Sequence, residues 1–240
     1  MKICRVNENS LIIYFADTVS EETADRIRRL LPLIKHKLGQ YLIDVIPSYT
    51  SLFISFDLLA MEFSLFEQEL WALLENIKEI QTDQTEAPLI ELAVYYGPEV
   101  ALDAGEISDH TGLSFEEVVS IHASTLYRVY AIGFAPGFAY LGNTDQRIAI
   151  PRKQTPRLKI PACSVAVAEQ QTAIYPNESP GGWQIIGRAP VNPIDYQREN
   201  LTLFEVGAKV KFNRISKATF LDMGGVISPE EERLFLLEAE

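Results

Sequence analysis

Residues 133–188 constrain the fold of this chain more than any other part of the sequence. Glycine, proline and aromatic residues alternate there, as in GFAPGFAYL at 133–141 and SPGGWQIIGR at 179–188. Glycine and proline allow turns that other residues resist, and the large rings between them can seal those turns. A segment that served only to fill a core would not need so many special positions so close together. We therefore expect a shaped surface for a ligand or a partner, with a purely structural cluster of loops as the alternative.

The composition supports one or two folded domains and argues against several kinds of partner. A chain of 240 residues with 47% hydrophobic residues is long and apolar enough to bury a core. The formal net charge of −12 argues against nucleic acid or an anionic membrane, because their phosphates would repel the protein. Cys4 and Cys163 lie far apart and form no disulfide framework. Without a signal peptide or a membrane-spanning apolar run, we expect a cytoplasmic protein.

Residues 1–82 predict a small N-terminal α/β sandwich with the order β-β-α-β-β-α. Two segments rich in β-forming residues flank a turn at 7–10, and a similar pair follows the first helix. Ser20 is the expected N-cap of that helix, and Pro32 should bend or split it. Apolar residues recur at helical spacing over 63–77 and predict the second helix. Nothing in this domain indicates chemistry.

The domain boundary is expected in residues 80–88, which are polar and aperiodic. A second domain is expected over 88–216, followed by a C-terminal tail at 217–240 with a short helix capped at Ser228. The chain is therefore predicted to have an α+β fold of two domains.

Short strands dominate the predicted second domain. Helices are expected at 100–107 and from Ser114 to about 123, where Ser114 and Glu117 form a capping box. Many short strands punctuated by glycine and proline predict a barrel or a sandwich. The strands are expected at 89–96, 126–132, 147–150, 164–168, 173–175, 183–188, 201–204 and 210–215.

The residues best suited to chemistry form an anion-binding set. Arg152, Lys153, Arg157 and Lys159 follow one another closely, and the prolines at 151 and 156 hold the segment extended. Arginine offers a planar fork for carboxylate or phosphate, although a solvated strand edge with local salt bridges would use the same residues. The sequence contains no phosphate-binding loop, no nucleophile elbow and no metal motif.

Residues near these cations in sequence could complete a pocket. Gly181 and Gly182 could present backbone N–H groups to an oxyanion, and Gln171 and Thr172 could hydrogen-bond an amide or a carboxylate. His122 is either a base or phosphate contact, or a histidine that meets the dipole at the end of its helix. The walls of the pocket would come from Tyr140, Tyr175 and Trp183.

Several of these motifs resemble those of the KipI family, also called the 5-oxoprolinase B subunit (PxpB) or allophanate hydrolase subunit 1. They extend over residues 91–212 and include the glycine-rich segments quoted above and QTAIYP at 171–176. The first domain matches more loosely, through DVIPSY at 44–49. The family usually has glycine where this chain has Cys163 and Ala173.

The resemblance implies an N-terminal α+β domain joined to a cyclophilin-like β-barrel. In the 5-oxoprolinase members, PxpB works with two partners, the KipA-like PxpC and the PxpA protein. Together they couple hydrolysis of MgATP to opening of 5-oxoproline, which yields glutamate. By this resemblance Arg152, Arg157 and His122 are the candidate catalytic residues, with no metal site of the chain's own. The candidate substrate- and phosphate-binding residues are Tyr140, Gln171, Thr172, Tyr175, Gly181, Gly182, Trp183 and Arg188.

Two other functions remain open at this point. Some relatives bind a sporulation histidine kinase through the C-terminal domain, which would make this chain a kinase inhibitor. Fused relatives occur in biotin-dependent urea carboxylase, which would make it a carboxyltransferase or allophanate hydrolase subunit in urea metabolism. The second role would need other polypeptides, because this chain has no biotin-carrier segment and no ATP-grasp motif.

Overall fold

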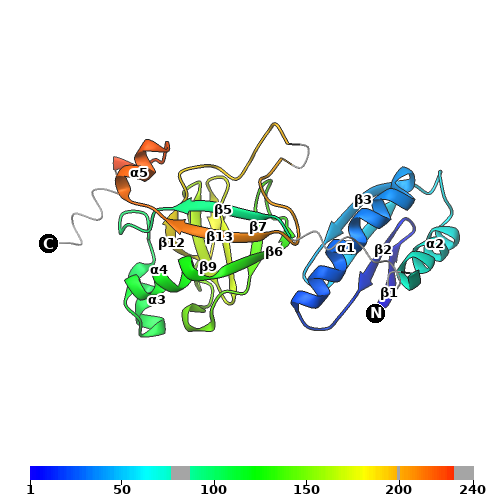
Figure 1. Ribbon diagram of the computed structural model, residues 1–240, viewed down its shortest axis with the longest axis horizontal. Helices are drawn as coiled ribbons and strands as arrows, with labels where there is room; N and C mark the ends of the chain where they lie inside the picture. The colour runs from blue at the N-terminus through cyan, green and yellow to red at the C-terminus, as the bar shows by residue number, and fades with distance from the viewer. Residues whose placement is uncertain (77–86, 199–200, 230–240) are drawn as a thin grey trace. The chain divides into compact units, whose positions relative to one another are not determined.

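The computed structural model describes residues 1–76, 87–198 and 201–229. Contacts divide the chain into two compact units, Met1–Ala87 and Pro88–Glu240, called here the first and the second unit (Figure 1). The helix predicted after Ser228 lies outside the described residues beyond position 229.

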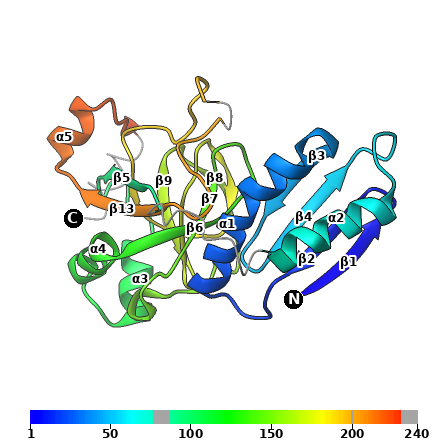
Figure 2. The ribbon, with the colours of Figure 1, turned by 45° about the vertical axis from the view of Figure 1, so that its right-hand side comes forward.

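The first unit is a four-stranded antiparallel sheet with two helices. The strand order is β1 (Lys2–Asn7), β2 (Ser10–Tyr14), β4 (Ser51–Phe56) and β3 (Leu42–Pro47). The helices α1 (Glu21–Leu38) and α2 (Phe63–Asn76) lie side by side on this sheet, and a short 3-10 turn at Gly39–Tyr41 leads from α1 to β3 (Figure 2). The predicted order of elements is therefore found.

One core joins both helices to the same face of that sheet. Alternate residues of the two central strands point into it, as the two-residue period of a strand requires. The apolar faces of α1 and α2 complete this core. The apolar pattern of the sequence therefore predicted these buried positions correctly. The fully or nearly fully buried members are Leu11, Ile13, Ile27, Leu30, Ile34, Leu38, Leu52, Ile54, Phe56, Phe66, Leu70 and Leu74.

The helix α1 runs without a break through Pro32, so the predicted split is wrong. Ser20 caps it as expected and accepts a hydrogen bond from the backbone N–H of Thr23. Proline removes one backbone donor inside the helix. Packing outweighs that loss, because Ile27 and Ile34, on either side of the proline, are both buried against the sheet.

The second unit is built on a curled sheet of seven strands. All neighbouring strands are antiparallel except β13 and β5, which run parallel. Their order is β12 (Gln184–Arg188), β9 (Ser164–Ala168), β10 (Gln171–Ile174), β7 (Ala139–Gly142), β6 (Leu126–Ile132), β13 (Lys209–Arg214) and β5 (Leu89–Val94). A separate ribbon pairs β8 (Arg157–Ile160) with β11 (Ser179–Gly181).

The two edges of the curled sheet meet at one point. Tyr95, directly after β5, donates its N–H to the carbonyl of Arg188 at 2.9 Å and accepts the N–H of Arg188 at 2.8 Å. Gly187 allows this approach, since a Cβ atom there would lie 2.7 Å from the carbonyl oxygen of Tyr95. The fold is thus mixed α+β, with a small antiparallel sheet in one unit and a half-barrel sheet in the other.

Strand β9 separates two cores within the second unit. Val165 and Val167 face the larger core, which fills the inside of the curled sheet. Ala166 and Ala168 face a smaller core that contains Phe138, Tyr175 and Trp183. Because successive side chains of a strand point to opposite faces, a strand buried on both faces is apolar throughout. The smaller core is the base of the candidate site.

Within the part of the second unit that the structure describes, three named helices accompany the curled sheet. The helices α3 (Ala104–Thr111) and α4 (Phe115–Ser124) pack against each other, beside β12 and β13 respectively (Figure 1). The predicted capping box is present, with reciprocal hydrogen bonds between Ser114 and Glu117. The helix α5 (Lys217–Asp222) is capped by Ser216, whose hydroxyl accepts the N–H of Thr219.

Several predicted boundaries in the second unit are wrong. The segment expected as a strand at 147–150 contains a 3-10 turn at Gln146–Ile148, because the side chain of Asp145 caps it by accepting the N–H of Arg147. The segment at 201–204 makes only an isolated bridge between Ile194 and Thr202. The helix expected at 100–107 begins at Ala104. Strands β7, β8 and β11, of three or four residues each, were not predicted.

Cys163 adopts a backbone conformation that favours glycine, with φ of +63°. This conformation costs a residue with a side chain roughly 1–2 kcal/mol. Glycine avoids most of that cost but loses about 0.5–1 kcal/mol of chain entropy on folding. We therefore expect Cys163→Gly to raise the free energy of unfolding of the second unit by about 0.5–1 kcal/mol, measured by denaturant titration.

Ala173 provides the matched control for this substitution. It is buried in β10 and is not among the residues with positive φ. Ala173→Gly should therefore lower the free energy of unfolding by about 1 kcal/mol or more. Equal losses at both positions would show that Cys163 is not strained.

Candidate functional site

A small cavity walled by aromatic rings lies between the turn at 134–138, the segment at 152–156 and the turn at 180–183. Its volume is about 190 Å³, and we call it the aromatic cavity. Six of the predicted site residues line it, although they come from separate parts of the chain. These are Tyr140, Arg152, Tyr175, Gly181, Gly182 and Trp183, and they are joined by Phe134, Phe138, Lys153, Pro156 and Pro180.

The rings of the aromatic cavity pack against one another edge to face. Phe138 is at their centre, with ring centroids 4.9 Å from Tyr140, 5.3 Å from Tyr175 and 5.9 Å from Trp183. Such T-shaped pairs are the favoured arrangement of aromatic rings. Burial raises the pKa of Tyr175 to about 12, so its hydroxyl stays protonated at neutral pH and acts as a neutral hydrogen-bonding group.

The APGF turn at 135–138 places Phe138 in this wall. The N–H of Phe138 donates to the carbonyl of Ala135 at 3.0 Å. Gly137, with φ of +79°, is required there because a Cβ atom would lie 2.7 Å from Cγ1 of Ile194. Phe134, at the start of the turn, has φ of +75° and is 64% exposed, with its ring 6.4 Å from that of Tyr175 at the mouth of the cavity.

Arg152 and one bare stretch of backbone give the cavity its polar character, since the ammonium group of Lys153 is paired with Asp103 and Glu106. The guanidinium of Arg152 lies 5.6 Å from the centre of the Trp183 ring, within the range of a cation–π interaction. At Gly181 a Cβ atom would lie 2.4 Å from the hydroxyl oxygen of Tyr175, so a side chain there would collide with the cavity wall. At Gly182 the nearest atoms are 3.6 Å away, which leaves room beside the backbone. The arrangement suits a small, flat, anionic ligand.

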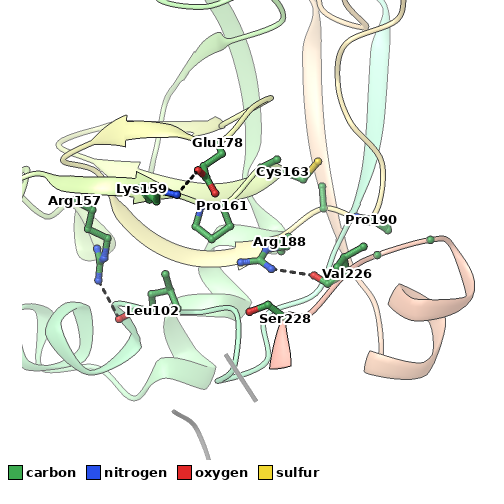
Figure 3. A pocket seen from close by; sticks show the side chains of 14 residues that line it. Leu102, Arg157, Lys159, Pro161, Cys163, Glu178, Arg188, Pro190, Val226 and Ser228 are labelled. Carbon is green, nitrogen blue, oxygen red and sulfur yellow. Dashed lines mark hydrogen bonds and ion pairs between the residues drawn. The ribbon is translucent and has the colours of Figure 1, made fainter. Parts of the chain in front are cut away.

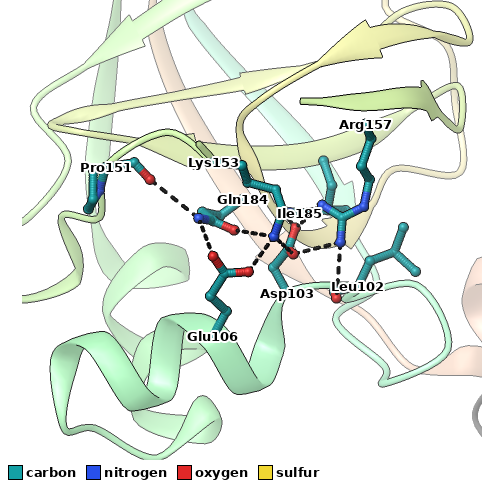
Figure 4. Close-up of polar contacts among 8 residues, drawn as sticks. All are labelled: Leu102, Asp103, Glu106, Pro151, Lys153, Arg157, Gln184 and Ile185. Atoms are coloured by element: carbon teal, nitrogen blue, oxygen red, sulfur yellow. Dashed lines mark hydrogen bonds and ion pairs between the residues drawn. The ribbon is translucent and has the colours of Figure 1, made fainter. Parts of the chain in front are cut away.

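Arg157 does not line the aromatic cavity and belongs to an ion-pair network around the buried carboxylate of Asp103 (Figure 4). Its two terminal nitrogens donate to the carboxylate of Asp103 at 2.6 and 2.7 Å. Lys153 donates to the same carboxylate at 2.9 Å and also contacts Glu106. Asp103, which is 2% exposed, additionally accepts the N–H of Ile185 at 2.7 Å. The predicted catalytic role of Arg157 does not fit this position, because the network ties α3 to β8 and β12.

His122 and Thr172 are core residues rather than cavity residues. His122 is fully buried, with Nδ1 2.8 Å from the hydroxyl of Tyr96 and Nε2 2.9 Å from that of Thr172. Thr172 donates its proton to the carbonyl of Ala166, so its oxygen must accept from Nε2–H and Nδ1 must accept from Tyr96. Burial lowers the pKa of His122 to about 3, which keeps the ring neutral. A role for His122 as the catalytic base does not fit this environment.

The other two predicted residues also lie outside the aromatic cavity. Gln171 opens β10 opposite Gly142 and Ala168. Arg188 ends β12 and lines a second cavity, where its Nη1 donates to the carbonyl of Val226 at 3.0 Å (Figure 3). The structure thus brings together six of the eleven predicted residues and separates Arg152 from Arg157 and Arg188, which both line the second cavity.

Comparison with known proteins places this arrangement in a family. The carboxyltransferase domain family, subdomain C and D, matches residues 1–204. The 5-oxoprolinase B subunit of Bacillus subtilis is 35% identical over 91% of this chain and 95% of its own length. The chain belongs to the family of 5-oxoprolinase B subunits. That of Haemophilus influenzae is 35% identical over 68% of this chain and 72% of its own length.

Solved structures share the fold described above. TTHA0988 superimposes with a TM-score of 0.75 at 33% identity and covers 92% of this chain. This chain spans only 41% of TTHA0988, which is therefore much longer. The urea carboxylase of Kluyveromyces lactis gives a TM-score of 0.70 at 16% identity, and at that identity it supports the fold alone.

The main residues that sequence reasoning missed in this member of the family are Asp103, Glu106, Phe134 and Phe138. Asp103 precedes α3, where an aspartate normally caps the helix, but its side chain makes no capping bond and binds Arg157 instead. The two phenylalanines stand in the conspicuous GFAPGF motif, and their alternation with glycine was the available signal.

Within the ranges that the structure describes, no three His, Cys, Asp or Glu side chains gather as metal ligands would. None of the helices in those ranges is both long and apolar enough to cross a membrane.

Proposed function

We propose that this chain is the B subunit of an ATP-dependent 5-oxoprolinase and that the aromatic cavity binds 5-oxoproline. It would act with a PxpA-like protein and a KipA-like (PxpC-like) protein, and the curled sheet would be a cyclophilin-like barrel. The observation that carries this proposal is the grouping of Arg152, the Gly181–Gly182 backbone and five aromatic residues around one cavity of about 190 Å³.

The chemistry of the substrate matches the polarity of the cavity. 5-Oxoproline is a small flat lactam that carries one carboxylate. The guanidinium of Arg152 would bind this carboxylate, while Tyr140 and Trp183 would contact the faces of the ring. The lactam carbonyl would then face the open backbone at Gly182, where the absence of a side chain leaves space.

ATP would make the stable lactam reactive. The lactam oxygen would attack the γ-phosphorus, and ADP would leave. One water would then add to the activated carbon and the C–N bond would open, which leaves an acyl phosphate. A second water would hydrolyse this acyl phosphate and release phosphate. The products are ADP, phosphate and glutamate. Mg²⁺ would arrive on the triphosphate oxygens, which commonly supply much of its coordination. The part of this chain is to orient the lactam and to exclude water until it is activated.

Reconstitution tests this proposal directly. The chain would be mixed with its PxpA-like and PxpC-like partners, 5-oxoproline and MgATP, and glutamate and ADP would be measured. We expect the two products in equal amounts and only with all three proteins present. ATP hydrolysis without glutamate, or tight binding to a histidine kinase without turnover, would contradict it. Turnover of urea instead of 5-oxoproline would do so as well.

A further inference from the structure

Phe134 differs from the other residues that line the aromatic cavity, because its conformation and its exposure are both unfavourable. Its φ of +75° lies in the left-handed region, where residues with large side chains are rare. It is also 64% exposed, although a phenylalanine ring is normally stabilised by burial. Among the described non-glycine residues with positive φ, only Phe134 lines the aromatic cavity. A strained residue kept at a cavity indicates a role in function.

The turn around Phe134 holds the ring in place. Two backbone hydrogen bonds close this turn, from the N–H of Gly133 to the carbonyl of Phe138 at 3.1 Å and from the N–H of Phe138 to the carbonyl of Ala135 at 3.0 Å. Gly137 packs so closely that a Cβ atom would not fit there. The rings of Phe134 and Phe138 lie edge to face, with centroids 5.2 Å apart. The ring of Phe134 therefore has a fixed place beside the cavity.

The exposure of the lining residues distinguishes the floor of the aromatic cavity from its mouth. Phe138, Tyr175 and Trp183 are at most 5% exposed and form the floor. Phe134 and Arg152 are exposed and lie at the mouth. A ligand that binds its carboxylate at Arg152 therefore has that end at the mouth, where the ring of Phe134 also lies.

The size of the cavity limits the ligand further. Its volume of about 190 Å³ is below the roughly 300–1,000 Å³ that is typical of small-molecule sites. Such a volume suits a free lactam acid. It leaves little space for a further residue attached to the carboxyl carbon of the lactam.

We propose that Phe134 is a specificity-determining residue whose ring closes the mouth of the aromatic cavity against lactams that carry a further residue on the carboxyl group. This inference rests on the proposed function, and it adds the class of compound that the site rejects. Free 5-oxoproline binds with its carboxylate at Arg152. A 5-oxoprolyl group at the start of a peptide is excluded, because its first peptide bond meets the ring of Phe134 and offers Arg152 no carboxylate.

Phe134→Ala should widen the range of substrates in the reconstituted complex. We expect the ratio of kcat/KM for 5-oxoproline to that for 5-oxoprolylglycine to fall by about tenfold or more, the discrimination that pocket shape commonly provides. KM for 5-oxoproline should rise because a ring contact is lost, while kcat stays within about twofold of wild type. The measurement is the amount of ring-opened product, determined by liquid chromatography and mass spectrometry.

Three further variants separate the ring from other effects. Phe134→Tyr keeps the ring and should keep the ratio within about twofold of wild type. Phe134→Gly should change the ratio as Phe134→Ala does, but should unfold roughly 2–4 °C higher than Phe134→Ala, because glycine tolerates the positive φ. Tyr196→Ala is the matched control, since Tyr196 is also an exposed aromatic residue but does not line the cavity. It should leave both the ratio and KM unchanged.

Trp183 gives a readout that needs no substrate. The chain has two tryptophans, Trp71 in the first unit and Trp183 on the floor of the aromatic cavity. In a Trp71→Phe background the tryptophan fluorescence therefore comes from Trp183. Acrylamide should quench this fluorescence about twofold more strongly after Phe134→Ala, because the small probe then reaches the floor of the concave site.

Three results would overturn the inference. They are an unchanged ratio in Phe134→Ala, an equal change of the ratio in Tyr196→Ala, and unchanged quenching of Trp183. Failure of the proposed function is a different result, because wild type itself would then form no glutamate. Calorimetry of the full chain with 5-oxoproline and 5-oxoprolylglycine would still test the inference in that case. Preference of wild type for 5-oxoproline that is lost in Phe134→Ala would support it, and equal or absent binding of the two by wild type would overturn it.

Discussion

Replacing Asp103 by alanine is expected to lower the free energy of unfolding of the second unit by about 3–5 kcal/mol, the usual cost of breaking a buried ion pair from one side. The carboxylate is almost fully buried and accepts hydrogen bonds from Arg157, Lys153 and the N–H of Ile185. Without it, two cations would be left partly buried beside an unpaired backbone donor. The three elements that it joins, α3, β8 and β12, would lose their common contact.

Calorimetry of the full chain would measure this effect. The transition of the second unit should move down by at least about 6 °C, because each kcal/mol shifts the midpoint of a domain of this size by roughly 2–4 °C. The first unit should melt unchanged. Glu116→Ala is the matched control. Both carboxylate oxygens of Glu116 also accept hydrogen bonds from an arginine, Arg214, but this pair lies on the exposed surface. Glu116→Ala should lower the free energy of unfolding by less than about 1 kcal/mol. Equal effects of both substitutions would contradict the structural role of Asp103.

The same network predicts a dependence of stability on pH. Burial opposes ionisation of Asp103, but the hydrogen bonds from Arg157, the N–H of Ile185 and Lys153 outweigh it and hold the pKa below its ordinary value. The stabilisation is therefore complete above the unfolded pKa of about 3.9 and is lost as the pH falls through the folded pKa. Wild type should lose stability steeply below pH 4, and Asp103→Asn should show a flatter decline. Parallel curves for the two proteins would contradict this assignment.

Replacing Arg152 by alanine is expected to reduce kcat/KM for 5-oxoproline in the reconstituted complex by about 100-fold. A charge-assisted hydrogen bond contributes about 1.5–3 kcal/mol, and each 1.36 kcal/mol corresponds to a factor of ten. Arg152 is exposed at the aromatic cavity, with its guanidinium beside the Trp183 ring, so the fold should be unaffected. Arg152→Lys keeps the charge but loses the planar fork, and should recover only part of the activity.

Arg147→Ala controls for the loss of a positive charge. Arg147 is an exposed cation of the same unit, pairs with Asp145, and does not line the aromatic cavity. Arg147→Ala should leave kcat/KM for 5-oxoproline within about twofold of wild type. If Arg152→Ala retained wild-type activity, the aromatic cavity would not be the site of the lactam. Arg157→Ala, in contrast, should lose activity together with stability, because its partner is Asp103.

The sequence alone determined the elements whose signals are local. The strands β6 and β9 were predicted at their observed bounds, and the capping box of Ser114 and Glu117 starts α4 as expected. Each depends on residues within a few positions of one another, through alternation along a strand or a side chain that bonds the next turn. The glycine and proline motifs likewise marked the aromatic cavity, because the turns they permit are local too.

Only the tertiary structure decided which residues meet. Arg157 and Arg152 look alike in sequence, yet one binds Asp103, 54 residues away, and the other faces the aromatic cavity. His122 looked like a base, but burial under Tyr96 and Phe212 makes it a neutral core residue. The short strands β7, β8 and β11 exist because other strands pair with them, since three or four residues carry little preference of their own. The physical reason is the same in each case: ion pairing, burial and strand pairing depend on distance in space, which the order of residues does not contain.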